Sequence, residues 1–330
     1  MKPSFSGMMF KRLARRAGIR VHLEPGYGIV GQVRFPGNKK KYFRGARFDL
    51  NRLGSSIVAG DKDYANYFMK KMGYPTALGK AFYGDRWGRN GRDIRAAYKY
   101  AKQIGFPVFV KPNNLSQGEG VAKVFTKAEF YRAVRFILKR DEVFLVQRAL
   151  LGKDYRLLVL DGEMVSAYER FPFSVEGNGK STLRDLVRKK IKKLFRERTD
   201  VQARIDDPRI ISSIRRAGIS WNSILSKGRR VYLLHNANLS TGGDAIDVSK
   251  LVHSAFRRIA VRVTRDMGLR YCGVDLMVKG DISRSPRKYW ILELNAAPGV
   301  EYYASSGSEN RRRVERIYLR ILKAMERSRS

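Results

Sequence analysis

Apolar residues recur at helical spacing in five stretches of the chain. The pattern predicts helices over 63–72, 127–139, 182–198, 256–267 and 314–325, each with one apolar and one polar face. The second of these begins at Thr126-Lys-Ala-Glu129, a capping box. The helix over 182–198 has a strongly basic polar face, which is typical of a solvated surface and also of a surface that binds a polyanion.

Shorter apolar runs predict the β-strands. They are 27–35, 41–49, 106–111, 121–125, 143–150, 155–160, 164–171, 271–278 and 289–296. Asp161-Gly162 predicts a tight hairpin between two of these strands. A strict two-residue turn would pair Arg156 with Ala167 and leave Arg170 on the opposite face from Arg156, unless a bulge redirects it.

A glycine-rich turn joins the strands 106–111 and 121–125. Residues 116–121 read Ser-Gln-Gly-Glu-Gly-Val, and Lys111 lies at the end of the preceding strand. Glycines allow backbone N–H groups to surround phosphate oxygens, and the lysine adds positive charge beside them. An ordinary hairpin gives the same pattern, so the nucleotide interpretation depends on the other polar residues.

Two further strands carry polar residues that packing does not explain. Asp275 interrupts an apolar run, and Glu293 and Asn295 share one face of the next strand. Such oxygen ligands suit Mg²⁺, which combines carboxylates with nucleotide phosphates. Asp154 and Arg156 also share a face, where they could hold ribose hydroxyls and phosphate.

Composition limits the class of protein. The 330 residues have 43% hydrophobic content and a net charge of +38. We therefore expect a folded, soluble, cytoplasmic protein without membrane insertion. The charge is compatible with nucleic acids, anionic membranes or acidic substrates as partners, does not choose among them and does not require a partner. The single cysteine, Cys272, excludes an intramolecular disulfide, and the histidines His22, His235 and His253 lack metal-ligand spacing.

Together these motifs resemble the ATP-grasp carboxylate–amine ligases. The resemblance is to the ATP-grasp region of cyanophycin synthetase and to the glutathione-synthetase module of bifunctional glutathione enzymes. The matching stretches, in the family's order, are 61–66, 73–76, 110–112, 116–121, 152–156, 177–182, 207–209, 236–243, 273–275 and 293–299. The resemblance implies an α+β ATP-grasp fold in which two α+β subdomains hold the nucleotide.

The resemblance also implies a role for individual residues. The implied ATP-binding residues are Lys111, Ser116, Gln117, Gly118, Gly120, Val121, Gln147 and Asp154. Arg156 and Arg170 match arginines near the transferred phosphate, and Asn238 belongs to a loop over the acyl-phosphate end. Asp275, Glu293 and Asn295 match the ligands of two Mg²⁺ ions. In the strand that includes Gln147-Arg148, the relatives usually carry paired acids.

We therefore predict a ligase that uses ATP and Mg²⁺ to join a carboxylate to an amine through an acyl phosphate. The charge favours an acidic peptide or another polyanion as a substrate. Two alternatives are an ATP-grasp kinase of a polyanionic small molecule and a basic nucleic-acid-binding protein. The predicted parts are a basic β-rich region (1–60), a helical linker (61–105), a subdomain with the glycine-rich lid (106–170) and a subdomain with the metal site (171–330).

Overall fold

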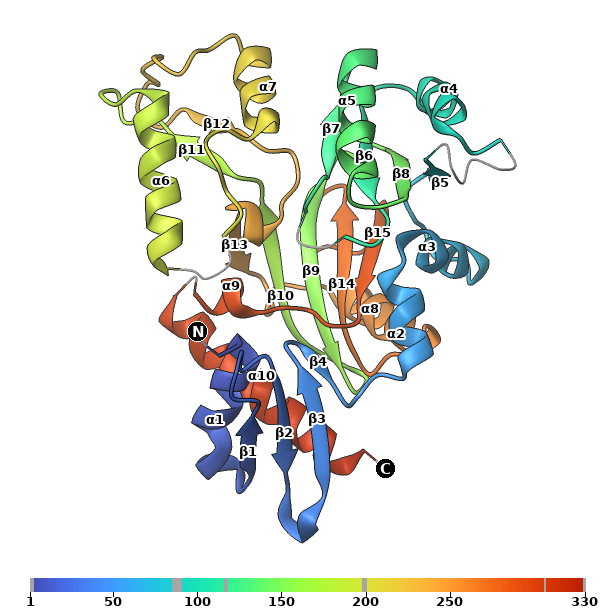
Figure 1. The fold of residues 1–330 in the computed structure, drawn as a ribbon, viewed down its shortest axis with the longest axis vertical. Coiled ribbons are helices and arrows are strands. Elements are labelled where there is room, and N and C mark those ends of the chain that lie inside the picture. The colour runs from blue at the N-terminus through green and yellow to red at the C-terminus, as the bar shows by residue number, and fades with distance from the viewer. Residues whose placement is uncertain (1–2, 85–90, 116–117, 198–200, 306, 329–330) are drawn as a thin grey trace.

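A computed structural model of the chain describes residues 3–84, 91–115, 118–197, 201–305 and 307–328. Four β-sheets organise these residues. Figure 1 shows two lobes side by side above a central sheet, with the N-terminal sheet at the opposite end of the molecule. In the described part of the chain, every helix is too short or too polar to cross a lipid bilayer.

The central sheet has five antiparallel strands in the order β13-β10-β9-β14-β15. They are β9 (Lys153–Leu160), β10 (Glu163–Phe171), β13 (Asp244–Asp247), β14 (Tyr271–Val278) and β15 (Tyr289–Asn295). Because side chains alternate along a strand, the two faces of β9 belong to different cores. Leu157 packs with α8 (Ser254–Asp266), whereas Leu158 packs with α10 (Ser308–Arg327).

A β-bulge between Met164 and Ser166 changes the register of the β9–β10 hairpin. Beyond the bulge, Tyr168 lies opposite Arg156, and Arg170 lies opposite Asp154. The strict register, which pairs Arg156 with Ala167, is therefore wrong by one residue. The bulge fulfils the condition under which Arg170 shares the face of Asp154 and Arg156.

The lobe on the right of Figure 1 contains a four-stranded sheet in the order β5-β8-β6-β7. Its strands are β5 (Gly79–Tyr83), β6 (Val108–Pro112), β7 (Ala122–Val124) and β8 (Val143–Arg148). Apolar side chains of α4 (Ile94–Ile104) and α5 (Lys127–Leu138) form a core with one face of this sheet. Thr126 caps α5 as predicted, since its hydroxyl accepts from the Glu129 N–H at 3.2 Å, while the Glu129 carboxylate accepts from the N–H of Phe125, one residue before the N-cap, at 2.7 Å.

The lobe on the left of Figure 1 is a smaller module with its own core. It consists of β11 (Ser174–Glu176), β12 (Arg230–Tyr232), α6 (Leu183–Glu197) and α7 (Pro208–Arg216). Phe173, Leu194 and Ile210 are among its buried residues. The loop that follows β12 contains a 3₁₀ turn, η2 (Leu239–Thr241), and returns the chain to the central sheet.

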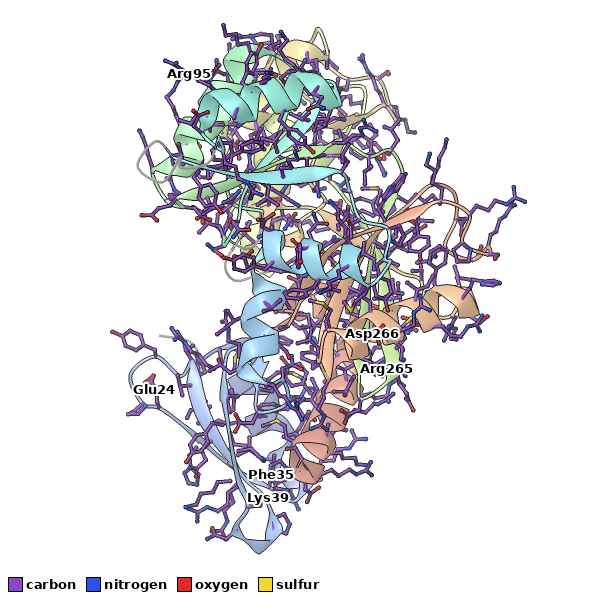
Figure 2. All side chains as sticks on the ribbon, turned by 90° about the vertical axis from the view of Figure 1, so that its right-hand side faces the viewer. Glu24, Phe35, Lys39, Arg95, Arg265 and Asp266 are labelled. Carbon is purple, nitrogen blue, oxygen red and sulfur yellow. The ribbon has the colours of Figure 1, made fainter. Side chains whose placement is uncertain are left out.

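The N-terminal region forms a sheet in the order β1-β2-β3-β4, packed on α10. The elements before the central units are α1 (Phe5–Ala17), β1 (Arg20–Leu23), β2 (Val30–Arg34), η1 (Pro36–Asn38), β3 (Lys40–Arg44), β4 (Arg47–Phe48), α2 (Leu53–Gly60) and α3 (Lys62–Lys71). Phe10 is fully buried, with its ring 5.4 Å from that of Tyr318. In Figure 2, Phe35 and Lys39 lie beside α10, where Lys39 donates to the backbone carbonyl of Glu326.

The predicted helices and strands of the main units are confirmed, but several other elements were not predicted, among them α1, α2, α7, β5, β11, β12 and β13. The predicted N-terminal hairpin forms between β2 and β3, but α1 and α2 lie in a region predicted as β-rich. The buried stripe of α1 consists of Met9, Phe10 and Leu13. Basic residues stand between Phe10 and Leu13 and make this stripe difficult to recognise in the sequence. Strand β5 was not predicted, because it is only five residues long and begins with Gly79.

The predicted boundary at residue 170 remains a prediction. The β9–β10 hairpin, which we grouped with the glycine-rich lid, is hydrogen-bonded to β14 of the central sheet. The helix α9 (Glu301–Ala304) then leads from this sheet into α10.

Candidate active site

Two arginines and two carboxylates converge on one face of the central sheet. Arg156 makes a bidentate pair with Asp275, with N–O distances of 2.6 and 2.7 Å. Arg170 donates to Asp275 at 2.9 Å and to Asp154 at 2.8 Å. The Arg170 and Asp275 side chains are 6% and 3% exposed. Charges this deeply buried require such partners, because an unpaired ion loses its hydration without compensation.

Glu293 and Asn295 extend this cluster on the adjacent strand. Glu293 is the register partner of Asp275, and the Asn295 amide donates to the Glu293 carboxylate at 3.1 Å. Burial raises the pKa of Glu293, but the positive charges of Lys62, Arg156 and Lys111 outweigh it and lower the pKa to about 2. The carboxylate is therefore ionised at neutral pH.

The fit of a magnesium ion differs among the three predicted ligands. Glu293 is 28% exposed, and Asn295 directs its N–H group to Glu293, which leaves the amide oxygen for a cation. Asp275 is different, because both of its oxygens accept from arginines. Within the described residues there is no group of three or more His, Cys, Asp or Glu arranged to hold a metal. The donor set fits Mg²⁺ bound jointly by protein and phosphate oxygens rather than by protein alone.

Lys111 projects from β6 in the neighbouring lobe. Its ammonium group donates to the Gln147 amide oxygen at 2.9 Å, and the residue is 8% exposed. Burial lowers the pKa of Lys111 to about 8, although Glu293 opposes the shift. Gln147 thus holds the lysine without neutralising its charge.

Lys62 is a site residue that the sequence reasoning missed. Its ammonium group donates to the backbone carbonyls of Asn113 and Leu115, at 2.9 and 2.8 Å, where the chain leaves β6 for the glycine-rich turn. Its charge also lowers the pKa of Glu293. Lys62 lies within the matched stretch 61–66, which was the available signal.

The glycine-rich turn approaches the asparagine-rich loop closely. Gly118 has φ of +76°, and a Cβ placed there would lie 2.5 Å from Nδ2 of Asn236 and 2.8 Å from Cγ of Asn238. Gly120 also has positive φ, +67°, but its nearest neighbours would be 3.4 Å away. The turn ends at Val121, whose N–H donates to the Gly118 carbonyl at 3.3 Å. Ser116 and Gln117 lie outside the described residues.

The described part of the predicted site is therefore assembled from three units. The central sheet contributes Asp154, Arg156, Arg170, Asp275, Glu293 and Asn295, the right lobe Lys111, Gln147 and the turn, and the left module the loop with Asn238. Sequence reasoning did not assign roles to Asn236 or Arg209, although both lie in matched stretches.

Two family models match the chain. The D-ala D-ala ligase C-terminus model matches residues 68–205, and the RimK-like ATP-grasp domain model matches residues 234–312. Together the two matches include the predicted site residues of all three units.

Curated proteins with similar sequences are enzymes of ligase type. The chain is 30% identical over 222 residues to the glutathione biosynthesis bifunctional protein of Clostridium perfringens, with 64% of this chain and 28% of that protein covered. It is 34% identical over 232 residues to the cyanophycin synthetase of Trichormus variabilis, with 64% of this chain and 24% of that protein covered. The chain thus spans about a quarter of the length of these relatives.

The crystal structure of a bifunctional glutathione synthetase from Pasteurella multocida has the same fold. Its TM-score is 0.63 at 22% identity, and the match covers 97% of this chain and 43% of that chain. The predicted α+β ATP-grasp fold and the resemblance to ATP-grasp ligases are confirmed.

Proposed function

Because the chain resembles the ATP-grasp carboxylate–amine ligases and has their fold, we propose that it is an ATP-dependent ligase that forms an amide or peptide bond through an acyl phosphate. The observation that carries this proposal is the convergence of Lys111, Arg156 and Arg170 with the carboxylates Asp275 and Glu293. Such a set can bind phosphate oxygens and neutralise the charge that moves during phosphoryl transfer.

The reaction has two covalent steps. A carboxylate oxygen of the substrate attacks the γ-phosphorus of ATP, and ADP leaves. The amine nitrogen then attacks the acyl carbon and loses a proton, while the C–O bond to phosphate breaks. The protein's contribution is mainly positioning and charge neutralisation.

Each residue of the site has a role in this proposal. Lys111 and the N–H groups of the glycine-rich turn bind the ATP phosphates, and Asp154 binds the ribose. Arg156 and Arg170 exchange part of their pairing with Asp275 for the transferred phosphoryl group. Glu293, Asn295 and Asp275 would hold Mg²⁺, two ions in our proposal, which supplies positive charge to the phosphate oxygens.

The left module supports an acidic peptide or another polyanion as a substrate. The outer face of α6 exposes six cations, Arg184, Arg188, Lys189, Lys192, Lys193 and Arg196. Among the described residues, no acidic side chain forms an ion pair with Arg188, Lys189 or Lys192. The opposite face of α6 reaches the asparagine-rich loop, since a Cβ on Gly242 would lie 3.0 Å from Leu194. A polyanion bound along the outer face of α6 would therefore lie roughly 10 Å, one helix diameter, from this loop.

A panel of carboxylates and amines, including acidic peptides, tests the proposed function by ADP release and product mass. We expect acceptor-dependent ADP release and a product whose mass equals the sum of the two substrates less one water. Lys111→Ala and Glu293→Gln should abolish both signals, whereas Lys71→Ala, at an exposed lysine on α3, should not.

Other outcomes of the same experiment would contradict the ligase. ADP release with a phosphorylated acceptor and no condensation product would identify a kinase. Tight, strongly salt-dependent binding of DNA or RNA that survives Lys111→Ala, without ADP release on any substrate, would identify a nucleic-acid-binding protein.

A further inference from the structure

Helix α7 begins with a tightly held arginine. Asp207 caps the helix by accepting from the backbone N–H of Arg209 at 2.9 Å. The same carboxylate also accepts from the Arg209 guanidinium, at 3.0 Å from Nε and 2.7 Å from Nη2. Pro208 lies at the first helical position, where its fixed φ favours helix initiation. Asp207 therefore fixes the orientation of the Arg209 guanidinium by holding its Nε and Nη2 atoms.

The other side of that guanidinium reaches out of the left module to the glycine-rich turn. Nη1 of Arg209 donates to the carbonyl of Gly118 at 3.1 Å and to the carbonyl of Val121 at 3.0 Å. These two carbonyls lie on either side of Glu119 and Gly120, and the Arg209 side chain is only 25% exposed. Arginine suits this position because its planar group can donate to Asp207 and to both carbonyls at once.

This contact determines which way the backbone of the turn faces. The C=O and N–H of one peptide plane point in opposite directions. With the Gly118 carbonyl held toward Arg209, the N–H of Glu119 points away from α7. A backbone N–H presented in this manner is the group with which a glycine-rich turn binds phosphate.

A second contact joins α7 to the same lobe. Arg216 pairs with Glu129 of α5 at 2.5 Å and stacks over the Phe125 ring at 3.5 Å from its centre. The C-terminal end of α7 thus contacts the elements that follow the turn, and Arg209 at its N-terminal end contacts the turn itself.

We propose that Arg209 is a positioning residue that fastens the glycine-rich turn to the left module and so orients its N–H groups for the nucleotide. The same module holds the asparagine-rich loop, so Arg209 links the ATP end of the site to the acceptor end. The inference rests on the proposed function only in that the turn binds ATP.

The test compares Arg209→Gln with Arg215→Gln on the full chain. Arg215 is exposed on the same helix. Its substitution removes the same charge at a position that does not contact the turn. Titration calorimetry with Mg²⁺ and ATP, in the absence of acceptor, should show about 10-fold weaker ATP binding for Arg209→Gln and unchanged binding for Arg215→Gln. Hydrogen exchange of residues 118–122 should become faster only in Arg209→Gln, also without nucleotide.

Equal ATP affinity and equal hydrogen exchange in Arg209→Gln and wild type would overturn the proposal. An equal loss of ATP affinity in Arg209→Gln and Arg215→Gln would also overturn it, because that result would indicate a general charge effect. If Arg209→Gln does not fold, hydrogen exchange in Arg209→Lys tests the proposal instead. Lysine cannot donate to Asp207 and both carbonyls in one plane, so faster exchange at 118–122 is expected, and wild-type exchange would overturn the proposal.

The proposed role of Arg209 and the proposed ligase activity can be contradicted separately. A wild-type protein that binds ATP but forms no amide would contradict the ligase and leave the Arg209 comparison intact. A wild-type protein that does not bind ATP would contradict the proposed function, while hydrogen exchange in the free protein would still decide whether Arg209 fastens the turn.

Discussion

The pairing of Arg156 and Arg170 with Asp275 is informative at the scale of single residues. Asp275 is 3% exposed and accepts from both arginines, so the two positive charges share its carboxylate, and Asp154 supplies a second negative charge to Arg170. The resemblance to the ATP-grasp ligases implied that these side chains belong to one site, whereas the strict hairpin register placed Arg170 on the opposite face from Arg156. The pairing itself could not be predicted, because it depends on the antiparallel register that places Asp275 opposite Arg156 and on the bulge that turns Arg170.

The two described glycines of the turn provide a matched pair of substitutions. Gly118→Ala and Gly120→Ala each place a side chain at positive φ, at a cost of roughly 1–2 kcal/mol. Only Gly118→Ala also collides with Asn236 and Asn238. We expect Gly120→Ala to weaken ATP binding alone, and Gly118→Ala to raise the acceptor KM as well. Steady-state kinetics with each substrate varied in turn measures this difference, and equal acceptor KM values would contradict it.

The pKa of Lys111 predicts a pH dependence of ATP binding. Burial lowers this pKa to about 8, and of the nearby charges Glu293 and Asp275 raise it while Lys62 lowers it. Lys111 is therefore charged below about pH 8 and loses its proton as the pH rises through that value. ATP affinity should fall over this range, because the neutral amine attracts phosphate less.

Lys111→Arg is the control for this pH dependence, since arginine stays protonated at these pH values. Affinity measured between about pH 7 and 9.5 should then show no decline attributable to this position. A decline of equal size in wild type and Lys111→Arg would assign the effect to another group.

Among the secondary-structure elements, those with strong local signals were predicted well. Helix α5 was predicted from its capping box and apolar stripe, and the N-terminal boundary agrees with the Thr126 contact. Helix α1 was missed because its buried stripe is defined by packing against the N-terminal sheet and α10, which are distant in sequence. The bulge at Met164 to Ser166 also lacked a local signal, since neither glycine nor proline marks it.

Helix α6 makes the polyanion proposal testable. Charge reversal of Arg188 and Lys192 to Glu should raise the KM for an acidic acceptor severalfold and reduce its salt dependence, with kcat nearly unchanged. The KM for ATP should not change. The control is reversal of Arg95 and Lys99, two exposed cations on α4 in the other lobe, where Figure 2 labels Arg95. Equal effects of the two double variants would show that net charge alone matters.

At the scale of the whole molecule, the site depends on the relative placement of two lobes and one sheet. Collinear motifs identified the strands that carry Lys111, Asp154, Asp275 and Glu293. They did not predict that the left module contacts the glycine-rich turn through Arg209, because an arginine–carbonyl contact between residues 118 and 209 leaves no pattern in one sequence. The net charge of +38 remains a property of the whole surface, of which α6 is the part we relate to the substrate.

The transfer of ¹⁸O from a labelled carboxylate substrate tests the central claim most directly. In the proposed reaction, one carboxylate oxygen becomes the bridging oxygen of the acyl phosphate and leaves with phosphate when the amine attacks. Mass spectrometry should therefore find one ¹⁸O in the released phosphate and one in the amide product, in amounts equal to ADP. Unlabelled phosphate, or a phosphorylated acceptor that retains both labelled oxygens, would contradict carboxylate activation by this protein.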